Sequence, residues 1–135
     1  VDHVGIAVAD LDTAVAFYTT LFGMVETHRE VNVEQGVAEA MIQPAAAAPS
    51  ATEIQLLAPL TPESTIARFI DRSGQGLQQL AFRVSDVRRA GDLLRSKGIR
   101  LLYDEPKSGT HNSLINFVHP KDAGGVLIEL VEPSA

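Results

Sequence analysis

An internal repeat is the feature of this sequence that most limits how the chain can fold. Residues 2–11 (DHVGIAVADL) and residues 78–87 (QQLAFRVSDV) each read as a short apolar strand followed by an aspartate. Aspartate is a favoured N-cap, and apolar residues follow at helical spacing in both halves. Glycine, which favours the left-handed backbone at the end of a helix, then closes each helical pattern. The predicted caps are Asp10 and Gly23 in the first half, and Asp86 and Gly98 in the second.

The two halves also close with the same pattern. Residues 53–59 (EIQLLAP) align without gaps on residues 127–133 (LIELVEP). Between the helix and this closing segment we predict two further strands per half, at residues 24–30 and 37–43, and at residues 99–104 and 113–119. The repeated unit is therefore β-α-β-β-β, with module one at about residues 1–60 and module two at about residues 75–133.

The segments between the modules predict a loop and a linking helix. Residues 44–52 are rich in Ala and Pro and predict a surface loop. Residues 61–74 predict a linking helix with its core at residues 64–71. We expect a single α+β domain over residues 1–135, whose two modules form a cupped sheet around a central site.

Composition excludes several classes of protein. The chain has no cysteine, so disulfides, thiolate metal sites and cysteine nucleophiles are excluded. A net charge of −6 argues against nucleic-acid binding, and no apolar run is long enough for a membrane helix. The strand-like start, with no signal-peptide pattern before it, predicts a cytoplasmic protein. Eight of the eleven basic residues lie between Arg68 and Arg100, which indicates either a solvated helix face or a local anion site.

Four polar residues interrupt the apolar strands at equivalent positions of the repeat. His3 corresponds to Gln79, and Gln55 corresponds to Glu129. Taken singly, such a glutamine is more often a hydrogen-bonded strand residue than a ligand. Their matching positions favour a joint role near a pseudo-two-fold axis. One imidazole nitrogen and three oxygens suit a divalent cation, with Co²⁺, Mn²⁺, Ni²⁺, Zn²⁺ and Mg²⁺ as candidates.

Several segments of the chain resemble methylmalonyl-CoA epimerases, a family of the vicinal-oxygen-chelate superfamily. The resemblance covers nearly the whole chain. It is carried by residues 2–8 (DHVGIAV), 34–37 (EQGV), 53–60 (EIQLLAPL), 103–106 (YDEP), 119–121 (HPK) and 124–130 (GGVLIEL). It implies paired β-α-β-β-β modules, a divalent metal, an acyl-CoA substrate and a homodimer.

The resemblance also implies roles for individual residues. His3, Gln55 and Glu129 match the family's metal ligands, while Gln79 stands where the family has histidine. An amide oxygen is a poorer donor than imidazole, so we expect a weakened metal site.

The resemblance assigns proton transfer to Glu39 and Glu129, which would act on opposite faces of an enolate. Glu39 lies in an otherwise apolar strand, where burial would raise its pKa and make it a better base. The alternative for Glu39 is an exposed strand position.

Lys107, His111 and Lys121 are candidates for contacts with CoA, although simple solvation explains either lysine alone. Two other functions stay open: action on a related acyl-CoA, and non-catalytic binding of a small molecule.

Overall fold

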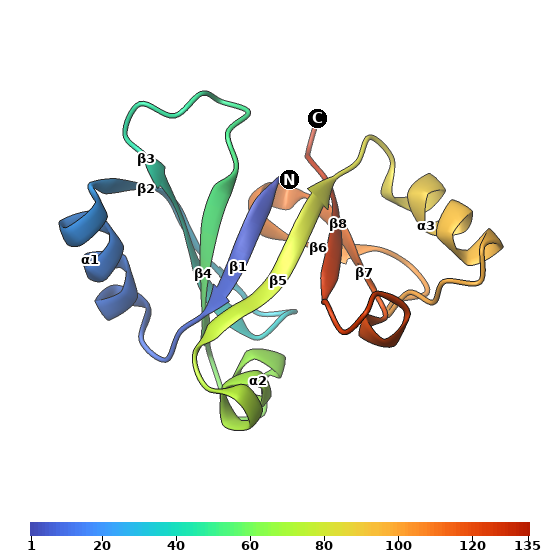
Figure 1. The fold of residues 1–135 in the computed structure, drawn as a ribbon, viewed down its shortest axis with the longest axis horizontal. Helices are drawn as coiled ribbons and strands as arrows, with labels where there is room; N and C mark the ends of the chain where they lie inside the picture. The colour runs from blue at the N-terminus through green and yellow to red at the C-terminus, as the bar shows by residue number, and fades with distance from the viewer. The chain divides into compact units, whose positions relative to one another are not determined.

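The computed structural model describes all 135 residues, Val1–Ala135, which divide into two compact units (Figure 1). One unit is His3–Gln78, and the other combines Gln79–Ala135 with Val1–Asp2. None of the three α-helices is long and apolar enough to cross a membrane.

In the unit His3–Gln78, four strands pair in the order β2 (Met24–Asn32), β3 (Val37–Pro44), β4 (Glu53–Pro59) and β1 (His3–Ala7). β3 is antiparallel to both β2 and β4, while β1 runs parallel to β4. The predicted caps are confirmed, because the Asp10 carboxylate accepts hydrogen bonds from the backbone N of Asp12 and Thr13, and Gly23 ends the helix at φ +65°. The elements are β1 (His3–Ala7), α1 (Leu11–Phe22), β2 (Met24–Asn32), β3 (Val37–Pro44), β4 (Glu53–Pro59) and the predicted linking helix α2 (Thr65–Ser73).

One face of this four-stranded sheet is apolar and packs under α1 (Figure 1). Ile42 in β3 and Leu56 in β4 are fully buried there, against Leu11 and Val15 of the helix. Since side chains alternate along a strand, the residues between them point to the opposite face. The opposite face carries a second, smaller apolar cluster together with buried polar side chains.

Replacing Leu56 by alanine is expected to lower the free energy of unfolding by about 2–5 kcal/mol, because a cavity replaces a fully buried side chain. Urea denaturation measures this change. Leu93→Ala is the matched control, since Leu93 is 59% exposed on the second helical segment of the repeat. Equal destabilisation by both substitutions would contradict the proposed core.

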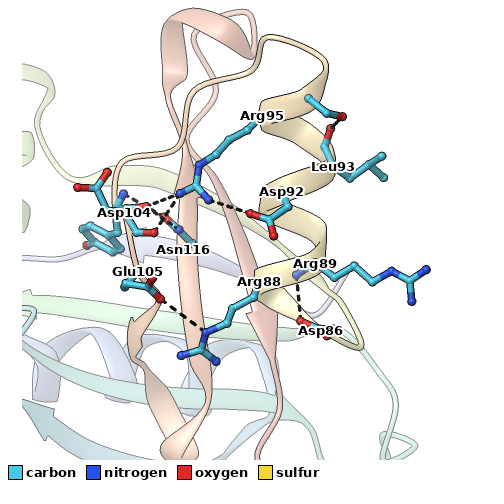
Figure 2. A network of polar contacts seen from close by, with 11 residues as sticks. Asp86, Arg88, Arg89, Asp92, Leu93, Arg95, Asp104, Glu105 and Asn116 are labelled. Atoms are coloured by element: carbon cyan, nitrogen blue, oxygen red, sulfur yellow. Dashed lines mark hydrogen bonds and ion pairs between the residues drawn. The ribbon is translucent and has the colours of Figure 1, made fainter.

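In the unit that contains Gln79–Ala135, strands pair in the order β5 (Gly76–Arg83), β8 (Ile128–Glu132), β7 (Leu114–Val118) and β6 (Lys107–Ser108). β5 and β8 are parallel, and β7 is antiparallel to both β8 and β6. The predicted cap Asp86 is confirmed, because its side chain accepts a hydrogen bond from the backbone N of Arg89 (Figure 2). The elements are β5 (Gly76–Arg83), α3 (Val87–Ser96), β6 (Lys107–Ser108), β7 (Leu114–Val118), β8 (Ile128–Glu132) and two short 3-10 turns, Thr110–Asn112 and Pro120–Asp122.

The strand predicted at residues 99–104 is wrong. Within this segment only Leu101 pairs, through an isolated bridge to Val118. The strand that follows α3 in the chain is instead the two-residue β6. The side chain of Asn116 explains the departure, because its Oδ1 accepts from the backbone N of Tyr103 at 3.1 Å and its Nδ2 donates to the Tyr103 carbonyl at 3.0 Å. A side chain thus satisfies the backbone groups that a strand partner would otherwise use.

The guanidinium of Arg95 adds a second tie between α3 and this segment. It donates to the Tyr103 carbonyl at 2.9 Å and faces Asp92 on its own helix (Figure 2). The helix ends at Ser96 with Lys97 as its cap, one position before the predicted cap, and Gly98 follows with the predicted left-handed backbone at φ +81°. The side chains that hold this segment are therefore provided by α3 and β7.

Candidate active site and metal ligands

Three of the predicted site residues share the face of the His3–Gln78 sheet opposite α1. Gln55 in β4 is paired with Gly5 in β1 and with Met41 in β3. His3 and Glu39 each lie two residues from those partners, so their side chains point to the same face as Gln55. His3 and Gln55 are 4% exposed, and Glu39 is 3% exposed. The exposed alternative for Glu39 is therefore wrong.

A hydrogen bond joins two of these buried residues. The Gln55 Nε2 donates to the Glu39 Oε2 at 2.9 Å. Because the bond uses the amide nitrogen, the donor atom that Gln55 can offer a cation is its oxygen. The same bond holds the carboxylate of Glu39 in one orientation, which suits a group that must meet a particular substrate atom.

A partly buried hydrogen-bonded pair lies on β2 beside Glu39. Glu30 is the cross-strand partner of Glu39, so both carboxylates share one face. His28 Nε2 lies 2.6 Å from Glu30 Oε1, and both side chains are 28% exposed. His28 has no role in the sequence-based predictions, and the structure places it in this pair.

Gln79 and Glu129 share one face of the other sheet. Glu129 in β8 is paired with Ala81 in β5 and with Phe117 in β7. Gln79 lies two residues before Ala81, so its side chain points to the face that carries Glu129. Gln79 is 9% exposed and Glu129 is 6% exposed.

The same register occurs in both units. In each, a candidate ligand in the closing strand has a small residue on one side and a large apolar residue on the other. Gln55 lies between Gly5 and Met41, and Glu129 lies between Ala81 and Phe117. Sequence reasoning missed the two large neighbours, because strand register, which the structure provides, places them beside the candidate ligands.

The donor chemistry of the four candidate ligands fits a divalent cation. His3 has an imidazole, Glu129 a carboxylate, and Gln55 and Gln79 have amide oxygens. Each is at least nine-tenths buried, and burial of such groups is costly unless they are hydrogen-bonded, paired or bound to a cation. Carboxylate and amide oxygens with one imidazole suit Mn²⁺, Co²⁺ or Mg²⁺. No group of three or more His, Cys, Asp or Glu side chains that could hold a metal ion occurs in the structure.

The candidate CoA-binding residues lie in strand β6 and in the two 3-10 turns of the unit that contains Gln79–Ala135, and all three are exposed. Lys107 Nζ is 4.3 Å from the centre of the Tyr103 ring, an arrangement that favours cation–π attraction. His111 has a left-handed backbone, with φ 57°, as does Asn112. Non-glycine residues adopt this backbone only at some energetic cost, and such strain is common at functional sites.

Lys121 belongs to the turn Pro120–Asp122, which two contacts hold in place. His119 Nδ1 accepts from the backbone N of Lys121 at 3.1 Å, so the His119 side chain stabilises this turn. Arg100 donates to both carboxylate oxygens of Asp122 at 2.9 Å and lowers the pKa of that carboxyl well below its ordinary value. The turn thus presents Lys121 from a fixed backbone.

The chain is similar to known proteins over almost its whole length. Residues 2–117 match the family model of the Glyoxalase/Bleomycin resistance protein/Dioxygenase superfamily. The crystal structure of methylmalonyl-CoA epimerase from Mycobacterium tuberculosis is 54% identical with a TM-score of 0.93, and the match covers 99% of this chain and 87% of that one. A methylmalonyl-CoA epimerase in complex with methylmalonyl-CoA and NH4+ is 43% identical with a TM-score of 0.94, over 100% of this chain and 94% of that one.

Another relative also matches almost the whole length of this chain. The Ethylmalonyl-CoA/methylmalonyl-CoA epimerase of Cereibacter sphaeroides is 37% identical over 131 residues, which cover 96% of this chain and 94% of that protein. Together with the solved structures, these matches confirm the α+β fold of two β-α-β-β-β modules that the sequence predicts.

Proposed function

Because the chain belongs to the methylmalonyl-CoA epimerase family of the Glyoxalase/Bleomycin resistance protein/Dioxygenase superfamily, we propose that it is an isomerase that interconverts the C2 epimers of methylmalonyl-CoA. The observation that supports this most strongly is the buried carboxylate of Glu39, which Gln55 holds at 2.9 Å. A protein that only binds a small molecule has no need to keep an oriented carboxylate on an otherwise buried face.

The reaction requires two proton transfers at C2. In one direction, the C2–H bond breaks, the proton moves to the carboxylate of Glu39, and the electron pair enters the enolate of the thioester. Glu129, which is protonated at the start in this direction, then donates its proton to the opposite face of C2; this inverts the centre and leaves Glu129 as a carboxylate. The reverse reaction exchanges these roles. The hydrogen bond from Gln55 keeps the carboxyl group of Glu39 in a fixed orientation during both proton transfers.

We assign His3, Gln55, Gln79 and Glu129 as the ligands of a divalent cation, with Co²⁺, Mn²⁺, Ni²⁺, Zn²⁺ or Mg²⁺ as candidates. Such a cation supplies Lewis-acid stabilisation of the negative charge on substrate oxygens when it is bound. Lys107, His111 and Lys121 are assigned to the anionic and amide groups of CoA. The single domain, the homodimer and the cytoplasmic location stay predictions.

Conversion of a single epimer tests the proposed function. The protein, supplied with each candidate metal in turn, is incubated with one C2 epimer of methylmalonyl-CoA, and the epimer composition is followed with time. We expect the composition to approach an equal mixture. A starting epimer that persists with every metal would contradict the proposed function.

Replacing Gln79 by histidine is expected to raise the affinity for Co²⁺ by about tenfold or more, which is about 1.4 kcal/mol. The reason is that imidazole is a better donor than an amide oxygen for a borderline metal. Calorimetric titration with Co²⁺ measures both forms. Gln78→His is the matched control, since the neighbouring side chain points to the other face of β5. If Gln79→His and the unmodified protein agree within error, residue 79 does not bind the metal.

A further inference from the structure

The two neighbours of Glu129 on its own sheet face differ sharply in size. Ala81 in β5 and Phe117 in β7 are its cross-strand partners, and both are buried. Directly opposite residues in an antiparallel pair have Cβ atoms about 4.5–5.5 Å apart. The ring of Phe117 therefore stands beside the side chain of Glu129 on one side, whereas Ala81 presents only a methyl group on the other.

Contacts with three neighbours restrict the ring of Phe117. The Tyr103 ring lies edge-on to it, with ring centres 5.8 Å apart and an interplanar angle of 81°. Ile115 and Val131 pack against it in the same apolar cluster. The backbone of Tyr103 is itself held by the side chains of Asn116 and Arg95 (Figure 2). The ring of Phe117 is therefore held in one position and forms a rigid wall beside Glu129.

We propose that Phe117 limits the size of the C2 substituent that this protein accepts. The inference rests on the proposed function, in which Glu129 transfers a proton at C2. A proton-transfer group must come within about 2.6–3.2 Å of its partner atom. The substituent on C2 then lies within reach of the side chain next to Glu129, and the large side chain there is Phe117. A methyl group fits beside such a wall more easily than an ethyl group does.

Steady-state kinetics with methylmalonyl-CoA and ethylmalonyl-CoA test this inference. One methylene in an apolar pocket changes kcat/KM by roughly 10–200-fold. Replacing Phe117 by leucine should therefore raise the ratio of kcat/KM for ethylmalonyl-CoA over methylmalonyl-CoA by about tenfold or more. Phe117→Met is a second variant, which tests the same shift if the leucine variant does not fold.

Val118→Ala is the matched control, because Val118 is the next residue of β7 and is also buried, but its side chain points to the other face. It should leave the substrate ratio unchanged. An unchanged ratio in the Phe117 variants, or an equal shift in Val118→Ala, would overturn the inference. Absence of activity of the unmodified protein on methylmalonyl-CoA would instead overturn the proposed function, so the two failures are distinguishable.

Discussion

Replacing Glu39 by glutamine is expected to reduce deuterium exchange at C2 of methylmalonyl-CoA by about 10²–10⁴-fold, because an amide cannot accept the proton. The variant should fold normally. Glutamine keeps the size of the side chain, and its amide oxygen can still accept the hydrogen bond that Gln55 donates to Glu39. Affinity for Co²⁺ should also be retained, since Glu39 is not an assigned ligand. The measurements are the initial rate of exchange in deuterated water and calorimetry with Co²⁺.

Glu30→Gln is the matched control for this variant. Glu30 lies on the neighbouring strand, on the same face, as the cross-strand partner of Glu39. The same change of charge there should leave exchange largely intact. If Glu39→Gln exchanges at the unmodified rate, Glu39 is not the base. If both variants lose exchange equally, the loss reflects the charge of this face rather than proton transfer by Glu39.

Replacing Glu129 by glutamine should have the broader effect, since it removes a proton-transfer group and an anionic ligand in one change. We expect C2 exchange to fall by at least about 10²–10⁴-fold. Affinity for Co²⁺ should fall by more than the roughly 10–100-fold that loss of a group outside the ligand set costs. Parallel exchange and calorimetric measurements then separate this variant from Glu39→Gln, which loses exchange alone.

Glu132→Gln serves as the control on the same strand. Glu132 lies three residues along β8, on the other face, where its Oε1 accepts from the backbone N of Val87 at 2.8 Å. Glutamine retains that acceptor, so activity and metal affinity should both persist. A Glu129→Gln variant that binds Co²⁺ as the unmodified protein does would show that Glu129 is not a metal ligand.

The repeat made much of the fold predictable from sequence. The caps Asp10, Gly23 and Asp86, and the closing strand Glu53–Pro59, occur where the pattern predicts them. These features depend on interactions between residues close together in the sequence, so a short segment is enough to predict them. The segment at residues 99–104 could not be predicted in the same way. Its backbone is held by the side chains of Asn116 and Arg95, and no local pattern reveals those contacts.

The candidate site shows the same division between local and long-range information. The sequence identifies four candidate site residues because each is a polar residue in an apolar strand: His3, Gln55, Gln79 and Glu129. All four are buried in the structure. The hydrogen bond from Gln55 to Glu39 joins two strands through a register that only the structure provides. Phe117 resembled an ordinary core residue in sequence, because its position beside Glu129 also depends on strand register.

Deuterium entry at C2 tests most directly whether this chain is an epimerase rather than a protein that only binds an acyl-CoA. The protein with Co²⁺ is incubated with one epimer of methylmalonyl-CoA in deuterated water, and C2 is examined by NMR spectroscopy or mass spectrometry. We predict that deuterium appears at C2 in both epimers, at a rate that depends on protein concentration. Saturable binding of methylmalonyl-CoA with no deuterium at C2 would contradict catalysis and would indicate a binding protein of the same fold.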